Sequence, residues 1–242
     1  MGMRTRLIIA IILSTSWSSP VWGATRAQLK KYVSEAMVYI VWDNPNGKRV
    51  QGSGVVFRLP RHSGKYVLTS HHVIEDAIAG KIPIRLQSFG MPEGKGQVTD
   101  LAGWHVFHDL ASYRLPEEMK EIRPLKLSQT FLKVNQKIGI YSFPMGAPWE
   151  SFGVVKGMRV KIYATPVGPQ IIKKYEFTNF VISGSSGGMM VNRDAELVGI
   201  VTHSKSPEAI RIGNFGGLGT PSPIILKLVD EAIKNGWRPK NN

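Results

Sequence analysis

Short segments rich in β-branched and aromatic residues recur along most of this chain of 242 residues. Gly, Pro, Asn and Asp separate them, which favours many short antiparallel strands over alternating strand and helix units. The segments are 37–42, 55–59, 66–69, 82–86, 97–101, 110–113, 137–142, 153–162, 175–182 and 197–201. The pattern therefore predicts an all-β fold, as barrels or sandwiches.

Helical spacing of apolar residues is found near both ends. Residues 25–35 predict a short helix capped by Thr25. A second helix is predicted over 222–236, where Ser222 is the cap, Pro223 takes the first helical position and Gly236 follows the last turn.

The first residues have the pattern of a secretory signal peptide. Arg4 and Arg6 precede the apolar run 7–13, and small residues follow near Gly23. Seven apolar residues are too few to span a bilayer, which takes about 20. We predict cleavage after Gly23, export to the periplasm or the extracellular space, and a mature chain of 24–242 without a transmembrane anchor. An uncleaved anchor is the alternative.

Composition narrows the function classes. The formal net charge is +14, and 29 basic against 17 acidic residues remain after removal of Arg4 and Arg6. The basic residues are scattered, with short pairs such as 30–31 and 173–174, so we expect a solvated basic surface and no specific nucleic-acid partner.

Cysteine is absent, which excludes disulfides and thiolate metal sites. Four histidines lie within 71–108, but we expect no metal, because no H-E-x-x-H helix accompanies them.

The stretch 183–188 reads Ser-Gly-Ser-Ser-Gly-Gly between two apolar segments. Glycine tolerates positive φ, so Gly184 can turn its amide toward the same point as the amide of Ser186. Two such amides beside a serine hydroxyl would stabilise the oxyanion of an acyl-transfer reaction. The same composition also fits an ordinary turn between strands.

A nucleophilic serine needs a base and a group that orients the base. His71 and His72 end an apolar strand, and only one of them can face Ser186, because successive side chains point in different directions. Asp109 stands at the start of another apolar strand, where it either orients a polar group or caps a turn.

Together these three stretches resemble the trypsin-like serine proteases, specifically the HtrA (Deg) type of the chymotrypsin fold. The T-x-x-H-V motif matches 69–73, D-L-A matches 109–111 and G-x-S-G-G matches 184–188, in the order of the family. The resemblance implies His72 as general base, Asp109 as orienting acid, Ser186 as nucleophile, and the amides of Gly184 and Ser186 as the oxyanion hole. Weaker matches at 51–56, 134–146, 197–201 and 217–222 extend it over nearly all of the mature chain.

The same resemblance implies the architecture of the protease domain, 24–242. We expect two antiparallel six-stranded β-barrels, at about 37–118 and about 122–221, between the short N-terminal helix and the C-terminal helix. Asn135, Ser142 and Ala195 stand where the family usually has glycine, and Met189 where proline is common. Ser185 stands where many digestive relatives have an aspartate that binds a freed N-terminus, so activation by propeptide cleavage is not implied. Only about six residues follow the last helix, so no PDZ domain is expected.

Substrate preference follows from the same resemblance. The residues expected to bind substrate are Phe180, Ser183, Val201, Thr202, His203, Ser204 and Gly217. The runs that contain them, 180–183, 201–204 and 215–219, have no Asp or Glu. We therefore expect the first substrate pocket to take small or medium apolar side chains rather than Arg or Lys. His203 would suit an acidic side chain, but the position that resembles the pocket histidine of glutamate-specific relatives is Val201.

The predicted function is a secreted or periplasmic serine endopeptidase that acts on protein or peptide substrates without a cofactor, in protein quality control. The alternatives are a catalytically silent module that binds protein partners through the same cleft, and a narrow-specificity processing protease or toxin.

Overall fold

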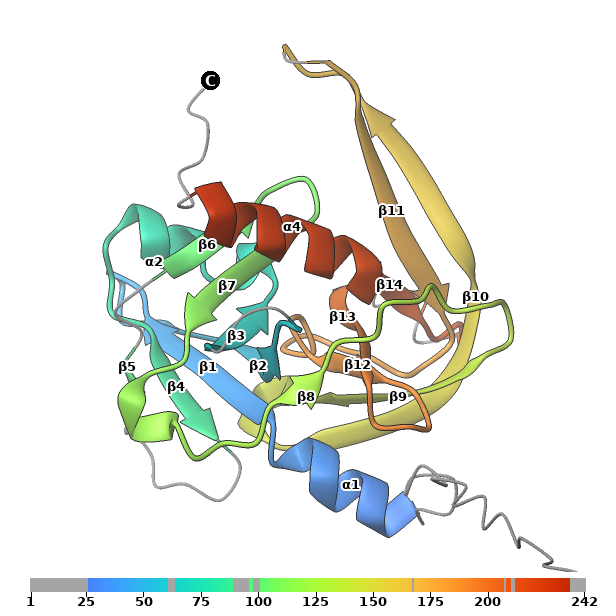
Figure 1. Ribbon diagram of the computed structural model, residues 1–242, viewed down its shortest axis with the longest axis horizontal. Helices are drawn as coiled ribbons and strands as arrows, with labels where there is room; N and C mark the ends of the chain where they lie inside the picture. The colour runs from blue at the N-terminus through green and yellow to red at the C-terminus, as the bar shows by residue number, and fades with distance from the viewer. Residues whose placement is uncertain are drawn as a thin grey trace, which may run out of the picture.

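The computed structural model describes residues 26–60, 64–88, 96–97, 101–166, 168–206, 208–209 and 212–235. The predicted signal peptide, 1–23, and Gly236 lie outside these ranges. Strands dominate the described chain, with one long helix lying across them (Figure 1). The predicted all-β fold is confirmed.

The N-terminal half is an antiparallel sheet with the strand order β5-β4-β1-β2-β3-β7-β6, to which β8 adds in parallel beside β2. Helix α1 (Arg26–Ser34) leads into it. The strands are β1 (Met37–Asp43), β2 (Arg49–Arg58), β3 (Lys65–Thr69), β4 (Arg85–Ser88), β5 (Gly96–Gln97), β6 (Leu101–His105), β7 (Leu110–Arg114) and β8 (Leu125–Lys126). Three short helical turns interrupt them: η1 (His71–Val73), α2 (Glu75–Ala79) and η2 (Glu117–Met119).

The C-terminal half is a closed barrel with the strand order β10-β11-β14-β13-β12-β9. Its elements are β9 (Lys137–Ser142), η3 (Pro144–Gly146), β10 (Trp149–Tyr163), β11 (Gln170–Phe177), β12 (Met189–Val191), β13 (Leu197–Ser204) and β14 (Gly217–Pro221). Closure gives every strand two neighbours, so the body of the barrel has no unpaired edge.

One hydrophobic cluster joins the two halves. It contains Phe57 from β2, Tyr141 from β9 and Met189 from β12, all buried. Helix α4 (Ser222–Asn235) adds Ile225 and Val229 to the same cluster from its apolar face. The C-terminal helix therefore covers the junction between the halves and packs against both of them.

The sequence pattern located most of the strands but missed four: β6, of which the predicted segment 97–101 covers only the first residue, and the short strands β8, β12 and β14. β8 has two residues, β12 has three, and β14 reads Gly-Leu-Gly-Thr-Pro, a composition typical of a turn. The run predicted as a strand over 175–182 leaves the sheet after Phe177. Asn135 and Ala195, two of the positions where the family usually has glycine, adopt φ of 65° and 57°, so these loops keep the left-handed backbone that glycine would favour.

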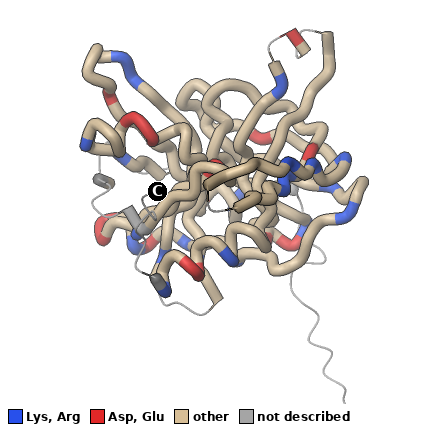
Figure 2. The backbone as a smooth tube through the Cα atoms, turned by 90° about the horizontal axis from the view of Figure 1, so that it is seen from above, with Lys and Arg blue, Asp and Glu red and all other residues tan. Residues whose placement is uncertain are grey.

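Basic residues lie on several sides of the molecule (Figure 2). The expectation of a solvated basic surface is wrong for one member of the pair 173–174, because Lys174 is only 7 % exposed. It lies on the same face of β11 as Ile172, two residues away, and both are buried.

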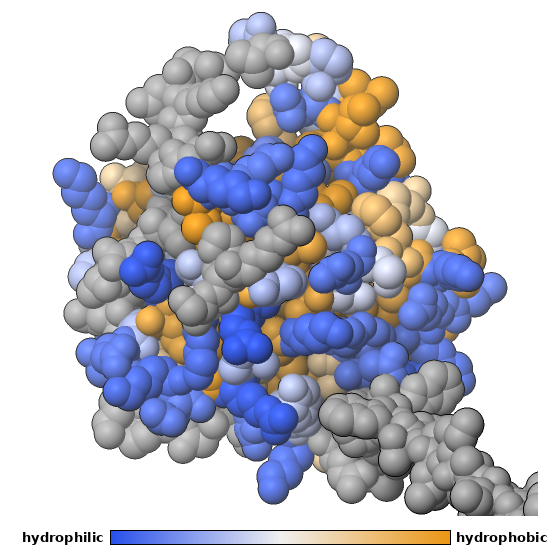
Figure 3. All heavy atoms as spheres, viewed as in Figure 1, coloured by the Kyte–Doolittle hydropathy of each residue, from blue (hydrophilic) through white to orange (hydrophobic). Residues whose placement is uncertain are grey.

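Strands β10 and β11 extend beyond the barrel as a long hairpin (Figure 1). Strand β11 pairs with β14 only over Tyr175–Phe177, so residues 159–163 and 170–174 pair only with one another. Val160, Ile162 and Ile171 on one face of this extension are exposed. Apolar surface gathers at the corresponding upper right of Figure 3.

Replacing Ile225 by Ala should lower the free energy of unfolding by about 2–5 kcal/mol, because it removes a fully buried side chain from the cluster that joins the halves. Lys227→Ala, an exposed change on the same helix, should alter stability by less than about 0.5 kcal/mol. Urea unfolding followed by far-UV circular dichroism measures both. Equal effects of the two variants would contradict the packing described for α4.

Candidate active site

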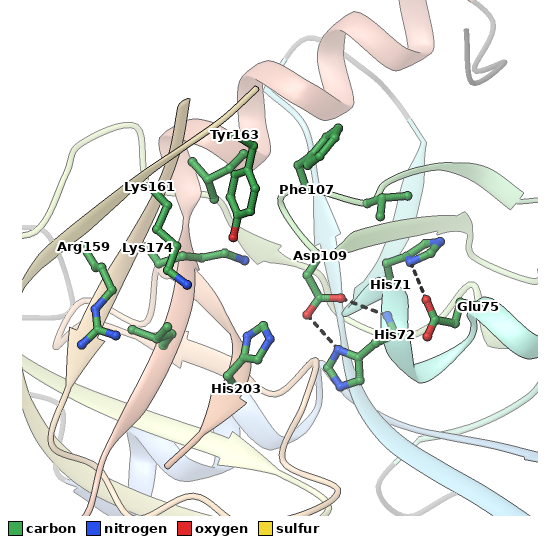
Figure 4. A pocket seen from close by; sticks show the side chains of 13 residues that line it. His71, His72, Glu75, Phe107, Asp109, Arg159, Lys161, Tyr163, Lys174 and His203 are labelled. Carbon is green, nitrogen blue, oxygen red and sulfur yellow. Dashed lines mark hydrogen bonds and ion pairs between the residues drawn. The ribbon is translucent and has the colours of Figure 1, made fainter. Parts of the chain in front are cut away.

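His72 lies just beyond the end of β3, in the turn η1. The Trp42 indole donates a hydrogen bond to the Val73 carbonyl (2.9 Å) and so anchors this turn on β1. The backbone N–H of His72 donates to Asp109 Oδ1 (2.9 Å), and its ring Nδ1 lies 2.8 Å from Asp109 Oδ2 (Figure 4). With Nδ1–H donating to the carboxylate, Nε2 is left as the lone-pair nitrogen of the ring.

Asp109 occupies the tight turn between β6 and β7, where its φ is 51°. The carboxylate is nearly buried, and burial alone would raise its pKa. The hydrogen bonds from the ring and the backbone of His72 outweigh burial, so the pKa of Asp109 lies below its ordinary value. Asp109 is therefore an anion at neutral pH with both oxygens directed at His72.

His71 points away from this pair. Its ring stacks against Trp104 with centroids 6.5 Å apart, and its Nδ1 lies 3.4 Å from the Glu75 carboxylate (Figure 4). Burial is the largest cause that lowers the pKa of His71. The two neighbouring histidines thus diverge, as the sequence predicted, and His72 is the one that meets Asp109.

The serine loop, residues 183–188, is a tight turn with an exposed Ser183, a buried Ser185 and a partly buried Ser186. The Ser185 amide donates to the Ile182 carbonyl (3.0 Å), and Gly184 has φ of +86°, as the third residue of a type II turn requires. Ser185 is buried, and its hydroxyl accepts a hydrogen bond from the Ile182 amide (3.3 Å). Ser186 is only partly buried, and its hydroxyl has no hydrogen-bond partner within the described chain, His72 included.

The amides of this loop fall into two groups. Those of Ser185, Gly187 and Gly188 donate to backbone carbonyls. In the part of the chain that the structure describes, the amides of Ser183, Gly184 and Ser186 donate to no protein group. The amides of Gly184 and Ser186 flank Ser185 and are the pair expected to form an oxyanion hole.

Ser53 in β2 holds this loop against the N-terminal sheet. Its amide donates to the Ser186 carbonyl (2.9 Å), and its hydroxyl donates to the Gly184 carbonyl (2.8 Å). The same hydroxyl accepts from the Phe143 amide (2.7 Å), and its carbonyl accepts from the Thr69 hydroxyl (2.7 Å). The amide, carbonyl and hydroxyl of the buried Ser53 are therefore all hydrogen-bonded, and they join the serine loop, η3 and the end of β3.

The Val201 carbonyl makes a second connection between the halves. It accepts hydrogen bonds from the Gly187 amide (2.8 Å) and from the Ser70 hydroxyl (2.9 Å). Gly187 follows Ser186, and Ser70 lies two residues before His72. The loop that carries Ser186 and the turn that carries His72 are thus joined through one acceptor.

Lys174 is a buried cation next to Asp109. Its ammonium donates to the His108 carbonyl (2.6 Å) and to the hydroxyls of Thr220 (2.6 Å) and Thr202 (3.3 Å). Burial lowers the pKa of Lys174 to about 8, while the Asp109 charge acts in the opposite direction. The charge pattern predicted a solvated Lys174, although its spacing of two from Ile172 was a signal that it could share the buried face of a strand.

His108 is also buried within this group. Burial, followed by the neighbouring His105 and Lys174, lowers the pKa of His108 to about 3. Its ring is therefore neutral, and the positive charge close to Asp109 is that of Lys174.

The residues expected to bind substrate occupy two places. His203 lies beside His72, with ring centroids 5.9 Å apart, and Phe180 packs edge-on against Phe215 at 5.1 Å. The others lie on β13, on β14 or in the serine loop: Ser183, Val201, Thr202, Ser204 and Gly217. Only His203 of the seven lines the cavity of about 460 Å³ that opens beside His72 and Asp109.

Two further features of the described ranges bear on function. They contain no group of three His, Asp or Glu side chains arranged to hold a metal ion. None of their helices has both the length and the apolar character needed to cross a membrane.

Known proteins similar to this chain are proteases. Residues 52–200 match the family model described as a trypsin-like peptidase domain. A probable periplasmic serine endoprotease DegP-like from Buchnera aphidicola subsp. Schizaphis graminum is 26% identical over 203 residues, which cover 80% of this chain and 39% of the relative. The periplasmic serine endoprotease DegP of Escherichia coli K12 is 24% identical over 192 residues, covering 76% and 36%. The chain thus spans little more than a third of the length of these relatives.

Solved structures share the fold. The crystal structure of Deg5 superposes with a TM-score of 0.66 at 21% identity, covering 87% of this chain and 94% of Deg5. The serine endoprotease from Yersinia pestis gives a TM-score of 0.66 at 20% identity, covering 88% of this chain and 68% of that one.

Gly187→Ala should prevent the serine loop from docking. Gly187 has φ of +80°, and an added Cβ would overlap the Ser53 carbonyl oxygen and the Thr69 hydroxyl. We expect a loss of several kcal/mol in stability, or failure to fold, in a thermal melt. Gly157→Ala is the matched control, since nothing lies near the Cβ it would add, and it should melt like the wild type. A Gly187→Ala protein as stable as this control would contradict the docking.

Lys174 should make the free energy of unfolding rise with pH between about 8 and 10.5. The lower limit is the pKa of Lys174 in the folded chain, and the upper limit is the ordinary pKa of lysine. In this window the folded chain has released the proton and the unfolded chain still binds it, so unfolding takes up a proton and becomes less favourable as pH rises. The wild type should gain up to about 3 kcal/mol relative to Lys174→Met, measured by urea unfolding across the window. Lys173→Met, at the exposed neighbouring position, should keep the wild-type pH dependence. Parallel curves for wild type and Lys174→Met would be the contrary result.

Proposed function

The chain belongs to the trypsin-like peptidase family, and from this premise we propose that it is an HtrA-type serine endopeptidase with His72, Asp109 and Ser186 as its catalytic triad. The observation that carries the proposal is the His72–Asp109 pair, which is docked against the Ser186 loop through the shared Val201 carbonyl. The resemblance of 69–73, 109–111 and 184–188 to the family's motifs agrees with it.

In the proposed reaction the Ser186 hydroxyl attacks the carbonyl carbon of a peptide bond, and His72 Nε2 takes its proton. Asp109 keeps the proton on Nδ1 in place and stabilises the imidazolium that forms. His72 then donates the proton to the leaving amine as the bond between carbon and nitrogen breaks, and an acyl-enzyme remains on Ser186. Water attacks this ester with His72 again as the base, which releases the acid and restores the serine.

The amides of Gly184 and Ser186 are proposed to bind the oxyanion of each tetrahedral intermediate. Both lack a protein acceptor among the described residues, and Gly184 has the positive φ that the turn requires. Each oxyanion-hole donor typically contributes about 3 kcal/mol to transition-state stabilisation. The neighbouring amides, which donate to carbonyls, hold the loop in shape.

We further propose that the substrates are unfolded or damaged proteins and that the enzyme works in the periplasm or outside the cell. This proposal draws on the signal-peptide pattern over 1–23 and on relatives named as periplasmic endoproteases. For the first substrate pocket we propose small to medium apolar side chains, since Phe180 and its neighbour Phe215 are apolar.

Labelling with a fluorophosphonate probe tests the proposed nucleophile directly. A single adduct on Ser186, located by peptide mass spectrometry, is expected for the wild type and should be lost in His72→Ala. Asp109→Asn should reduce turnover of a peptide substrate by about 10⁴-fold, because the imidazole then adopts the wrong tautomer. Thr130→Ala is the control: it removes an exposed hydroxyl outside the serine loop and should leave labelling unchanged.

The contrary outcome is equally clear. A folded wild type that is not labelled, even with unfolded protein present, would identify a silent binding module. An adduct on Ser183 instead of Ser186 would refute the assignment of the nucleophile.

A further inference from the structure

The cavity beside His72 has one strongly basic wall. This wall belongs to the hairpin beyond the barrel, where Arg159 and Lys161 on β10 and Lys174 on β11 line the cavity (Figure 4). Alternate residues of a strand share a face, which places the two β10 cations on the same side. Arg159 pairs across the hairpin with Lys174, and Lys161 pairs with Ile172, so the three cations form one surface.

This arrangement is electrostatically unfavourable unless an anion joins it. Like charges opposite one another on a sheet destabilise the pair. Arg159 contacts Glu176 at 3.3 Å, and Lys174 is held by neutral oxygens. Lys161 has no carboxylate within ion-pair distance among the described residues.

The acidic groups of the cavity do not supply the missing charge. Among the described lining residues the carboxylates are Asp109 and Glu75, and each is already directed at a histidine, at 2.8 Å and 3.4 Å respectively. His203 adds no charge at neutral pH, because burial lowers its pKa and Lys174 and Lys161 lower it further against the opposing effect of Asp109. Lys161 is therefore the cation of the basic wall that lacks a carboxylate partner among the described residues.

The remaining lining is apolar. The rings of Phe107 and Tyr163 pack against one another at the cavity with centroids 5.9 Å apart, and both are exposed. Val106, Ile172 and Leu218 complete this surface. A side chain with a short hydrocarbon stem and a terminal carboxylate matches both parts of the cavity: the stem contacts the rings, and the carboxylate reaches Lys161.

We infer that this cavity is a substrate subsite that selects an aspartate or glutamate side chain near the scissile bond, with Lys161 as the residue that determines the preference. The inference rests on the proposed function, because the cavity shares His72 and Asp109 with the proposed triad. A substrate residue is favoured over a free anion, since a chain positioned for attack at Ser186 passes beside His72. The subsite is distinct from the apolar first pocket proposed near Phe180.

Cleavage-site profiling tests the inference. Purified protein is incubated with a mixture of denatured proteins, and the cleaved bonds are mapped by mass spectrometry. Asp and Glu should be enriched by about 3-fold to 5-fold at one position near the scissile bond, the effect of a partly exposed ion pair. The enrichment should fall as ionic strength increases, because salt screens the pair.

Lys161→Glu should abolish the acidic enrichment and favour Lys or Arg at the same position. Lys173→Glu makes the same charge change on the opposite face of the hairpin, at an exposed position, and should keep the wild-type profile. Fluorophosphonate labelling of Ser186 should be the same in both variants, since neither touches the triad.

The outcomes separate the two proposals. No cleavage and no labelling of the wild type would overturn the proposed function. Cleavage and labelling without acidic enrichment, or the same profile for wild type and Lys161→Glu, would overturn only the subsite. An equal change in Lys173→Glu would show a general effect of net charge and would also overturn it.

Discussion

The hydrogen bonds of Ser53 are the constraint on which the rest of the site depends. Each half of the molecule can satisfy its own sheet, but the groups that could act together come from different halves. Ser53 binds the serine loop through Ser186 and Gly184, the start of η3 through Phe143, and the end of β3 through Thr69. A buried polar residue with every group satisfied costs little desolvation and holds a single geometry. Because all four partners must be in place together, the position of the serine loop is coupled to correct packing of both halves.

Lys174 adds charge to the same junction. Its ammonium joins β11, β13 and β14 of the barrel to the turn before Asp109 in the other half. A buried ammonium with neutral acceptors is expensive, and the lowered pKa of Lys174 expresses that cost. The nearby Asp109 carboxylate offsets part of it and is itself kept ionised mainly by His72. Two neighbouring charges, Lys174 in the barrel and Asp109 in the other half, therefore link the halves, and Asp109 in turn holds the His72 ring.

Much of the arrangement could be predicted from the sequence because its signals are local. Glycines around Ser186 and an apolar strand that ends at His72 are features of a few consecutive residues, and the structure brings these stretches together. The cations that line the cavity were not predicted, because their common face depends on the pairing of β10 with β11. That register shifts between Val155 and Gly157, and no periodicity in one strand reveals such an irregularity. The short strand β14 was missed for a related reason: tertiary pairing makes a strand of glycines and a proline that resemble a turn.

Side chains on the β10–β11 hairpin are less constrained by the fold than residues at the junction of the two halves. Residues 159–163 and 170–174 pair only with each other. Most side chains on this extension are therefore under no requirement from barrel closure, and Lys174 is the exception because it is bound to both halves. Substitutions at positions such as Lys161 can accumulate at small cost in stability while one wall of the cavity changes its charge. The charge of this wall can thus change by drift on an arm of the fold, whereas the residues around Ser53 are bound to one another and must change together.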